Sequence, residues 1–239
     1  MERVILVTGA SSDVGLELIK RIAPQYDLIL GHYCHMSDAL LRLKQELGEK
    51  LQLFQADFLN SSEVDKMIHD IDDKGHIPLH IVHLPAAKAV NQRFHKIVEE
   101  DFLESIEISI ISIIKILKHY IPKMNKEKYG KIVFMLTAYT LNIPPKYQSA
   151  YVTTKYALLG LLKSLSVEYA DKGITVNGVS PNMIDTKFLS DLPDIVIQQN
   201  ASKTARGRNL EVEDVVPVFE YLLSKDADSI TGQNIEINS

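Results

Sequence analysis

Short apolar runs alternate with segments of helical spacing along the whole 239-residue chain. Residues 3–8, 27–30, 51–55, 79–84, 131–136, 174–179 and 234–237 predict strands, and residues 14–22, 37–47, 63–71, 99–124, 150–169 and 213–223 predict helices. The strands are apolar without alternation, so both faces of their sheet must be covered by helices. This order predicts an α/β fold with a doubly wound, mostly parallel sheet in a single domain of residues 1–239.

Three segments need a closer interpretation. Residues 99–124 are rich in isoleucine, which favours strands, but their apolar positions have helical period, so we expect one long helix. Ser37 is expected to N-cap the helix at 37–47, and Ser61 or Ser62 the helix at 63–71. Residues 183–207 are polar and irregular. Irregular segments of this length in a compact domain are usually functional, so we expect a substrate lid, with a simple mobile loop as the alternative.

Composition excludes several classes of function. The formal net charge of −5 gives no basic surface for nucleic acid. Cys34 is the single cysteine, so the chain can form no internal disulfide, which suits a reducing compartment. The apolar stretch 106–121 contains several charged residues and is too polar for a membrane span. The first residues have no secretory signal pattern, and we expect a cytoplasmic protein. His80 and His83 would point to opposite faces of a strand, so no metal site is expected.

A glycine loop separates the first expected strand from the first helix. It reads Thr-Gly-Ala-Ser-Ser-Asp-Val-Gly at residues 8–15. A Rossmann-type sheet binds a dinucleotide pyrophosphate at this place, where a helix N-terminus presents free N–H groups. Gly9 would permit the tight turn, and Gly15 would let helix and strand approach. Asp13 would have to turn its carboxylate away from the pyrophosphate. The alternative is an ordinary helix-start turn.

A tyrosine and a lysine lie four residues apart at the start of the helix at 150–169. Tyr151 and Lys155 therefore share one helix face, one turn apart. A tyrosine with an unperturbed pKa of about 10 is a poor base at neutral pH. An ammonium group beside it would stabilise the phenolate and lower that pKa. The pair therefore predicts a general acid/base centre.

Together these motifs resemble the short-chain dehydrogenase/reductase family over the whole chain and in the right order. The glycine loop is similar to the family's Thr-Gly-x-x-x-Gly-x-Gly, with Asp13 at the middle glycine. Tyr151 and Lys155 match its catalytic pair. Residues 177–182 resemble its Asn-x-Val-x-Pro-Gly stretch, with Asn182 at the glycine, and residues 230–233 resemble its final turn. The resemblance implies a nicotinamide-dependent oxidoreductase, most similar to 3-oxoacyl-carrier-protein reductases.

The resemblance also implies a set of cofactor contacts. These would come from Gly9, Ser11, Ser12, Val14, Gly15, Asp57, Phe58, Tyr151, Lys155, Pro181, Ile184 and Thr186. NAD-specific relatives place an acidic residue after the second strand, where this chain reads Gly-His-Tyr-Cys-His at 31–35. The missing acid favours NADP(H) over NAD(H). These residues after the second strand include no arginine either. The 2′-phosphate of NADP(H) would therefore bind to His32, His35, Ser37 or backbone amides.

Two of the family's four catalytic positions are changed. The catalytic serine falls on Ala138, and the asparagine that anchors a relay water falls on Ser109. Thr137 would face away from position 138 in an extended strand, whereas Thr140 would share its face if the backbone stayed extended. Ser109 would still hold a water, with shorter reach. The candidate catalytic residues are therefore Tyr151, Lys155, Ser109 and Thr140.

Two functions remain open on this basis. The first is reduction of a small-molecule carbonyl, or oxidation of an alcohol, with Tyr151 as general acid/base. The second is a catalytically weak or inactive nucleotide-binding relative with a regulatory or subunit role, which Ala138 supports and the intact Tyr151–Lys155 pair opposes. The helices at 99–124 and 150–169 carry more apolar surface than one sheet face covers, so we expect a homo-oligomer, a tetramer or dimer.

Overall fold

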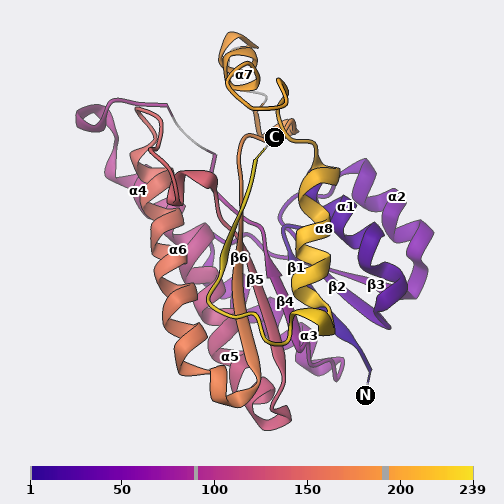
Figure 1. The fold of residues 1–239 in the computed structure, drawn as a ribbon. Coiled ribbons are helices and arrows are strands. Elements are labelled where there is room, and N and C mark those ends of the chain that lie inside the picture. Colours follow the sequence, from indigo (N-terminus) through magenta and orange to yellow (C-terminus); the bar gives the residue numbers. More distant parts are fainter. Residues whose placement is uncertain (1, 89–90, 190–193, 239) are drawn as a thin grey trace.

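The seven strands form one parallel sheet. The computed structural model describes residues 2–88, 91–189 and 194–238. Its strands are β1 (Val4–Thr8), β2 (Leu28–Tyr33), β3 (Leu51–Gln55), β4 (His80–His83), β5 (Gly130–Met135), β6 (Ile174–Pro181) and β7 (Asn234–Ile237), in the order β3-β2-β1-β4-β5-β6-β7. The order reverses between β1 and β4, which is where doubly wound sheets bind ligands. The predicted fold class is confirmed (Figure 1).

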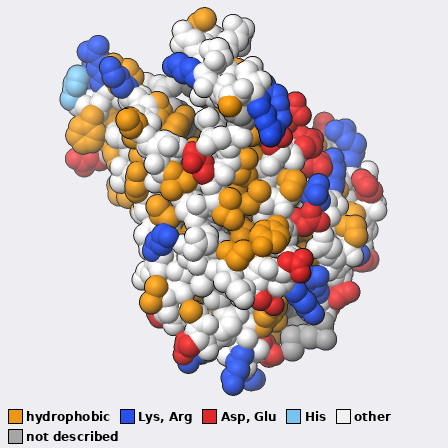
Figure 2. Space-filling view, in the orientation of Figure 1, with side chains coloured by type: hydrophobic (Ala, Val, Ile, Leu, Met, Phe, Trp, Pro, Cys, Tyr) orange, Lys and Arg blue, Asp and Glu red, His pale blue; other side chains and the backbone are white. Residues whose placement is uncertain are grey.

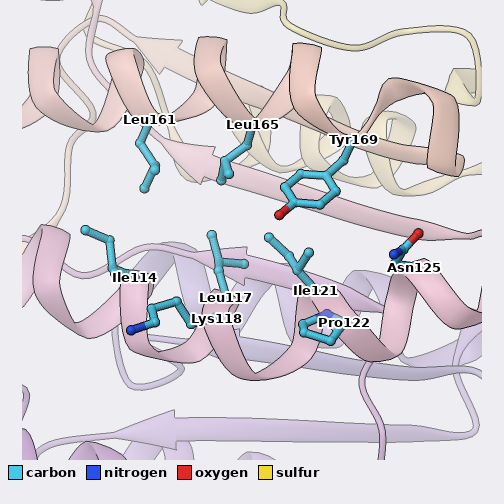
Figure 3. Close-up of a pocket in the computed structure, with 9 residues that line it drawn as sticks. All are labelled: Ile114, Leu117, Lys118, Ile121, Pro122, Asn125, Leu161, Leu165 and Tyr169. Carbon is cyan, nitrogen blue, oxygen red and sulfur yellow. The ribbon is translucent and has the colours of Figure 1, made fainter.

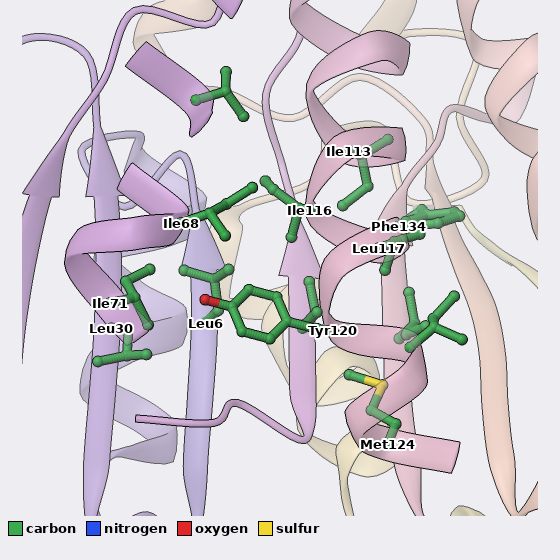
Figure 4. Packing of buried hydrophobic residues seen from close by; sticks show 14 of the residues in the cluster. Leu6, Leu30, Ile68, Ile71, Ile113, Ile116, Leu117, Tyr120, Met124 and Phe134 are labelled. Carbon is green, nitrogen blue, oxygen red and sulfur yellow. The ribbon is translucent and has the colours of Figure 1, made fainter. Parts of the chain in front are cut away.

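Helices cover both faces of the sheet and bury two separate cores. On one face α3 (Ser61–Asp73), α5 (Ser112–Glu127) and α6 (Ser149–Glu168) pack on the sheet. On the other face lie α1 (Asp13–Ile22), α2 (Asp38–Leu47) and α8 (Val212–Leu223). Figure 4 shows the first core, where Tyr120 of α5 lies beside Leu6 of β1 and Leu117 lies beside Phe134 of β5. Strands buried on both faces explain why their sequences do not alternate.

The expected long helix is continuous but not uniform. It begins with α4 (Glu99–Ile106), passes through a π-helical turn (Glu107–Ile111) and continues as α5. Helical period therefore outweighs the strand preference of isoleucine, because Ile113, Ile116 and Ile121 all bury on one face. The π-turn contains Ser109, one of the candidate site residues, and such turns often occur at functional sites.

Local details differ from the expectations at two places. Ser37 N-caps α2 as predicted, but Asn60 rather than Ser61 or Ser62 caps α3, because its side chain accepts the Ser62 amide. Residues 183–207 are not irregular throughout: they contain a 3₁₀ turn (Lys187–Leu189) and α7 (Asp194–Ala201). Residues 190–193 of this segment lie outside the described part of the chain. The segment rises above the carboxyl ends of the strands (Figure 1).

Candidate active site

The loop between β1 and α1 has the close approach that its glycines predict. Gly9 has a φ of +80°, which favours glycine. A Cβ at Gly15 would lie 2.4 Å from the Gly9 carbonyl oxygen, so only glycine fits. Ser12 caps α1: its hydroxyl donates to Gly9 O and accepts the Gly15 amide. The loop thus presents the start of α1 at the carboxyl edge of the sheet, where such a helix end favours a phosphate.

Asp13 turns toward the 183–207 segment. Its Oδ2 accepts the backbone amide of Lys187 at 2.8 Å. The residue that replaces the family's middle glycine therefore ties the start of α1 to the 3₁₀ turn at Lys187–Leu189. In the same turn, the Phe188 ring lies 6.3 Å from the Tyr151 ring, centroid to centroid. One short turn thus contacts both the glycine loop and the candidate acid/base.

Lys155 is buried against β5. Its Nζ donates to Met135 O at 2.7 Å, and the side chain is 2 % exposed. Burial lowers the pKa of Lys155 to about 8. The ammonium lies 5.7 Å from the centre of the Tyr151 ring, so the two side chains meet on one face of α6 as their spacing predicts.

The ionisation of Tyr151 differs from the expectation that Lys155 lowers its pKa. Burial raises the pKa of Tyr151 to about 12, and a hydrogen bond with the Thr137 side chain opposes that rise. Desolvation of the phenolate is the largest cause of this shift, and the Lys155 ammonium is hydrogen-bonded to the Met135 carbonyl. Tyr151 is therefore a phenol at neutral pH in this chain, which makes it a proton donor.

The turn after β5 does not place Thr140 beside Tyr151. The backbone forms a 3₁₀ turn at Ala138–Thr140 instead of staying extended. The Thr140 hydroxyl donates to Thr137 O and accepts from Asn234 Nδ2, 3.3 Å from Ser180 Oγ. Its bonds thus run toward β6 and β7. The side chain of Thr137, which strand alternation would direct away from position 138, acts to lower the pKa of Tyr151.

Ser109 lies in a buried chain of hydrogen bonds with His83. His83 Nε2 donates to Ser109 O at 3.1 Å, and its Nδ1 lies 2.9 Å from Thr8 Oγ1. Burial lowers the pKa of His83 to about 3, so the ring is neutral. No sequence pattern predicts contacts among Thr8, His83 and Ser109, because these residues are far apart along the chain. His83 thereby connects β1, β4 and the π-turn beneath the site.

At the end of β2, His32 is buried, and both of its ring nitrogens are bonded within the protein. Its Nε2 donates to Ala56 O, its Nδ1 accepts the Gly9 amide, and it is 3 % exposed. Phe58 stacks on it at 3.8 Å and is itself buried. His32 therefore cannot meet a cofactor phosphate, and the Phe58 side chain cannot line a cofactor site. Asp57 Oδ1 accepts the amide of Leu59, which lies before α3, so this bond holds the loop between β3 and the Asn60 cap.

The remaining expected cofactor positions gather where β6 ends. Pro181 closes β6, Ile184 pairs with Leu210, and Thr186 Oγ1 donates to Ile184 O at 3.4 Å. Across from them, the Gln92 amide donates to Tyr147 O, so the loop before α4 forms a wall with the turn before α6. No group of three or more metal-ligating side chains lies together in residues 2–88, 91–189 and 194–238. In the same residues, no helix is both long and apolar enough to span a membrane.

Comparison with known proteins identifies the family. The pattern of the family described as Enoyl-(Acyl carrier protein) reductase matches residues 25–239. The chain is 30% identical to the 3-oxoacyl-(acyl-carrier-protein) reductase FabG of Buchnera aphidicola, over 97% of this chain and 94% of that one. The chain belongs to the short-chain dehydrogenase/reductase family, a family of oxidoreductases, and it resembles the 3-oxoacyl-carrier-protein reductases within it.

Solved structures agree on the fold. A 3-ketoacyl-(acyl-carrier-protein) reductase from Brucella melitensis complexed with NADH superposes with a TM-score of 0.89 at 20% identity, covering 99% of this chain and 96% of that one. YwfH, described as an NADPH-dependent reductase involved in bacilysin biosynthesis, gives 0.89 at 19% identity, covering 100% and 97%. At these identities the likeness supports the single-domain, doubly wound architecture.

Proposed function

We propose that this protein interconverts a small-molecule carbonyl and its alcohol, using a nicotinamide cofactor. The observation that carries the proposal is the buried Tyr151–Lys155 pair at the carboxyl edge of the sheet, beside the turn at Lys187–Leu189 that also reaches the glycine loop. A bound nicotinamide supplies or accepts the hydride. The start of α1, with Gly9, Ser12 and Gly15, suits its pyrophosphate.

Tyr151 handles the proton in this reaction. In reduction, the phenol O–H bond breaks and the proton joins the substrate oxygen, as the carbonyl carbon gains hydride. Lys155 favours the resulting phenolate by its charge when protonated. The raised pKa of Tyr151 favours the reduction direction near neutral pH, because the donor form is then fully populated. Phe188 and the wall at Gln92 and Tyr147 would enclose the substrate.

The lid interpretation of residues 183–207 belongs to this proposal. The Asp13–Lys187 bond and the Phe188–Tyr151 contact support it, since both join the segment to the site. Substrate would enter between the segment and the wall formed by Gln92 and Tyr147.

The proposed cofactor preference is NADP(H) over NAD(H). An acid after β2 would repel a 2′-phosphate, and none is present in Tyr33-Cys34-His35. With His32 closed, the phosphate would meet exposed His35 and the start of α2, where the Ser37 hydroxyl accepts the Leu40 amide. Calorimetric titration with both cofactors tests this preference, and tighter binding of NAD(H) would reverse it.

A panel of ketones and alcohols, followed by cofactor absorbance, tests the activity itself. Turnover that Tyr151→Phe removes supports the enzyme. The alternative, a catalytically weak nucleotide-binding relative, draws its support from Ala138 and from the unavailability of Thr140. It predicts cofactor binding without turnover across the panel. The single cysteine suits a reducing compartment, and we place the protein in the cytoplasm on that ground.

We also propose that the protein assembles with copies of itself. An apolar groove of about 350 Å³ runs between α5 and α6, with Ile114 and Leu117 facing Leu161 and Leu165 (Figure 3). A second group of hydrophobic side chains lies on the face where β7 and α8 run (Figure 2). Two separate apolar faces suit a tetramer built from dimers, because each face needs its own symmetric partner.

Light scattering of the wild type and of Ile114→Glu tests this assembly. The charge should disrupt pairing across the groove and leave a smaller particle with unchanged circular dichroism. A wild type that is monomeric at micromolar concentration would refute the proposal.

A further inference from the structure

We propose that Asp13 is a positioning residue: its carboxylate holds the turn that carries Phe188 beside Tyr151, and its negative charge weakens binding of the dinucleotide. The inference rests on the proposed function, since it assumes that the pyrophosphate binds at the start of α1. Asp13 stands where the family's loop has its middle glycine, so the contact is a departure of this chain from the family's pattern.

A single hydrogen bond joins two parts of the chain that lie 174 residues apart. The Lys187 backbone amide donates to Asp13 Oδ2 at 2.8 Å. Asp13 is the first residue of α1, which Ser12 caps, so the helix and the glycine loop fix its backbone position. Lys187 is the first residue of the 3₁₀ turn Lys187–Leu189. The first amides of a helical turn have no partner within the turn, and the Asp13 carboxylate satisfies this one.

The chain just before this turn is anchored separately. Ile184 pairs with Leu210 in a β-bridge, and the Asp185 amide donates to Leu210 O at 2.9 Å. Asn209 is 4 % exposed, and its Nδ2 donates to Asp185 Oδ1 at 3.0 Å. One residue separates this anchored base from the amide that Asp13 binds. That bond therefore sets the direction in which the turn leaves the base.

The direction of the turn determines what lies beside the proposed acid/base. Phe188 follows Lys187 directly, and its ring lies 6.3 Å from the Tyr151 ring, centroid to centroid, with 42° between the ring planes. Phe188 is 43 % exposed, so burial in a core does not fix it. Loss of the bond to Asp13 would let the turn move away from Tyr151, and the substrate would lose one wall of its site.

The Asp13 carboxylate also affects dinucleotide binding. A helix start attracts phosphate through its free amides, and an acid in the first turn adds a negative charge at the same place. The bond to Lys187 directs the carboxylate toward the 3₁₀ turn, but a hydrogen bond from a neutral amide does not cancel the charge. Asp13 therefore strengthens the substrate site and weakens cofactor binding, and different substitutions can separate these two effects.

The first test measures the bond without cofactor or substrate. NMR follows hydrogen exchange of the Lys187 amide in the wild type, Asp13→Asn and Asp13→Ala. Asparagine keeps an oxygen that accepts the amide and alanine removes it, so exchange should be roughly tenfold faster in Asp13→Ala and close to wild type in Asp13→Asn. Equal exchange in the wild type and Asp13→Ala would overturn the proposal.

Glu17→Gln is the matched control for losing a negative charge from α1. Glu17 lies one turn further along the helix, where its carboxylate pairs with Lys20. This variant should leave exchange of the Lys187 amide unchanged. The same acceleration in Glu17→Gln as in Asp13→Ala would overturn the proposal.

The second test measures the charge. Calorimetric titration with NADPH and with NADH at low ionic strength should show roughly tenfold tighter binding to both Asp13→Asn and Asp13→Ala, because the like charge beside the pyrophosphate is gone. The gain should shrink at high salt, which screens that charge. Glu17→Gln should gain less, since its charge lies farther from the helix start. Unchanged or weaker binding in both Asp13 variants would overturn the proposal.

The third test separates positioning from stability. With any accepted carbonyl, Asp13→Ala should raise KM by about fivefold with a smaller change in kcat, and Asp13→Asn should keep the wild-type KM. Thermal unfolding should be alike in all variants, because the bond lies at the surface. A wild-type KM in Asp13→Ala would overturn the positioning role. If the wild type binds no dinucleotide and reduces no carbonyl, the proposed function fails, while amide exchange still decides whether Asp13 holds the turn.

Discussion

The proposed dinucleotide end and the proposed reacting centre lie on the same edge of the sheet, but their polar side chains form different kinds of interaction. At the dinucleotide end, both ring nitrogens of His32 are bonded within the protein, and Ser12 caps α1. At the reacting centre, Tyr151 and Lys155 are buried with ionisation shifted away from their charged forms. In the first region the polar side chains hydrogen-bond the backbone and fix its conformation. In the second region they are the groups that we propose take part in the reaction.

This difference predicts at which residues a mutation should change the reaction rate and at which residues it should change the stability of the fold. Side chains whose hydrogen bonds are all satisfied internally contribute to folding, and their loss leaves buried partners unpaired. Buried ionisable side chains with shifted pKa values contribute to the reaction, because their electrostatic effect on atoms that change charge is stronger away from water. The following predictions separate the two regions by these readouts.

Tyr151→Phe should have the largest effect. Removing the Tyr151 hydroxyl deletes the proposed proton donor, which is worth on the order of 10²–10⁴-fold in rate. Thermal stability and cofactor affinity should stay near those of the wild type, since the ring that contacts Phe188 is kept. Steady-state rates with any accepted carbonyl measure the effect. Full turnover in this variant would remove Tyr151 from the mechanism.

The two reaction directions should respond differently to pH. Burial raises the pKa of Tyr151 to about 12, so alcohol oxidation, which needs the phenolate, should speed up by roughly tenfold per pH unit through the neutral range. Carbonyl reduction needs the phenol and should lack this rise, because the phenol is already fully populated there. Initial rates in both directions at saturating cofactor test the sign. An oxidation rate that falls as the pH rises from about 6 to about 8 would contradict it.

The sequence predicted the fold better than the roles of individual residues in the candidate site. Apolar runs, helix caps and residue spacing are local signals, so the parallel, doubly wound fold class, Ser37 as N-cap and the meeting of Tyr151 with Lys155 all followed from them. The role of Thr140 did not follow, because the inference assumed an extended backbone and the chain turns into a 3₁₀ helix at Ala138.

Contacts between residues far apart along the chain could not be predicted from the sequence either. The bonds of His83 to Thr8 and Ser109 join residues 75 and 26 positions apart. The raised pKa of Tyr151 depends on burial that no spacing reveals.

His32→Ala should affect stability and leave cofactor choice alone. The variant leaves the Gly9 amide and the Ala56 carbonyl unpaired and removes the ring stacked on Phe58. Unpaired buried groups cost about 1–3 kcal/mol each, so the free energy of unfolding should fall by roughly 2–4 kcal/mol. Denaturant unfolding measures the loss, and titration should show an unchanged ratio of NADP(H) to NAD(H) affinity. A lost NADP(H) preference would mean that His32 opens to the phosphate.

Ala138→Ser should have the smallest effect, and its sign distinguishes two versions of the reacting centre. If the Thr137 side chain, which acts to lower the pKa of Tyr151, already supplies a donor, a serine adds a second one and the gain should stay below about tenfold. In a Thr137→Val background the same serine has no competing hydroxyl and should recover a larger share of the lost rate. A double-mutant cycle on kcat measures this coupling, because the two hydroxyls would act on neighbouring oxygens and their effects would not add. If Ala138→Ser raises kcat equally in both backgrounds, the two positions act independently, and the reacting centre of the wild type works without the hydroxyl that its relatives use.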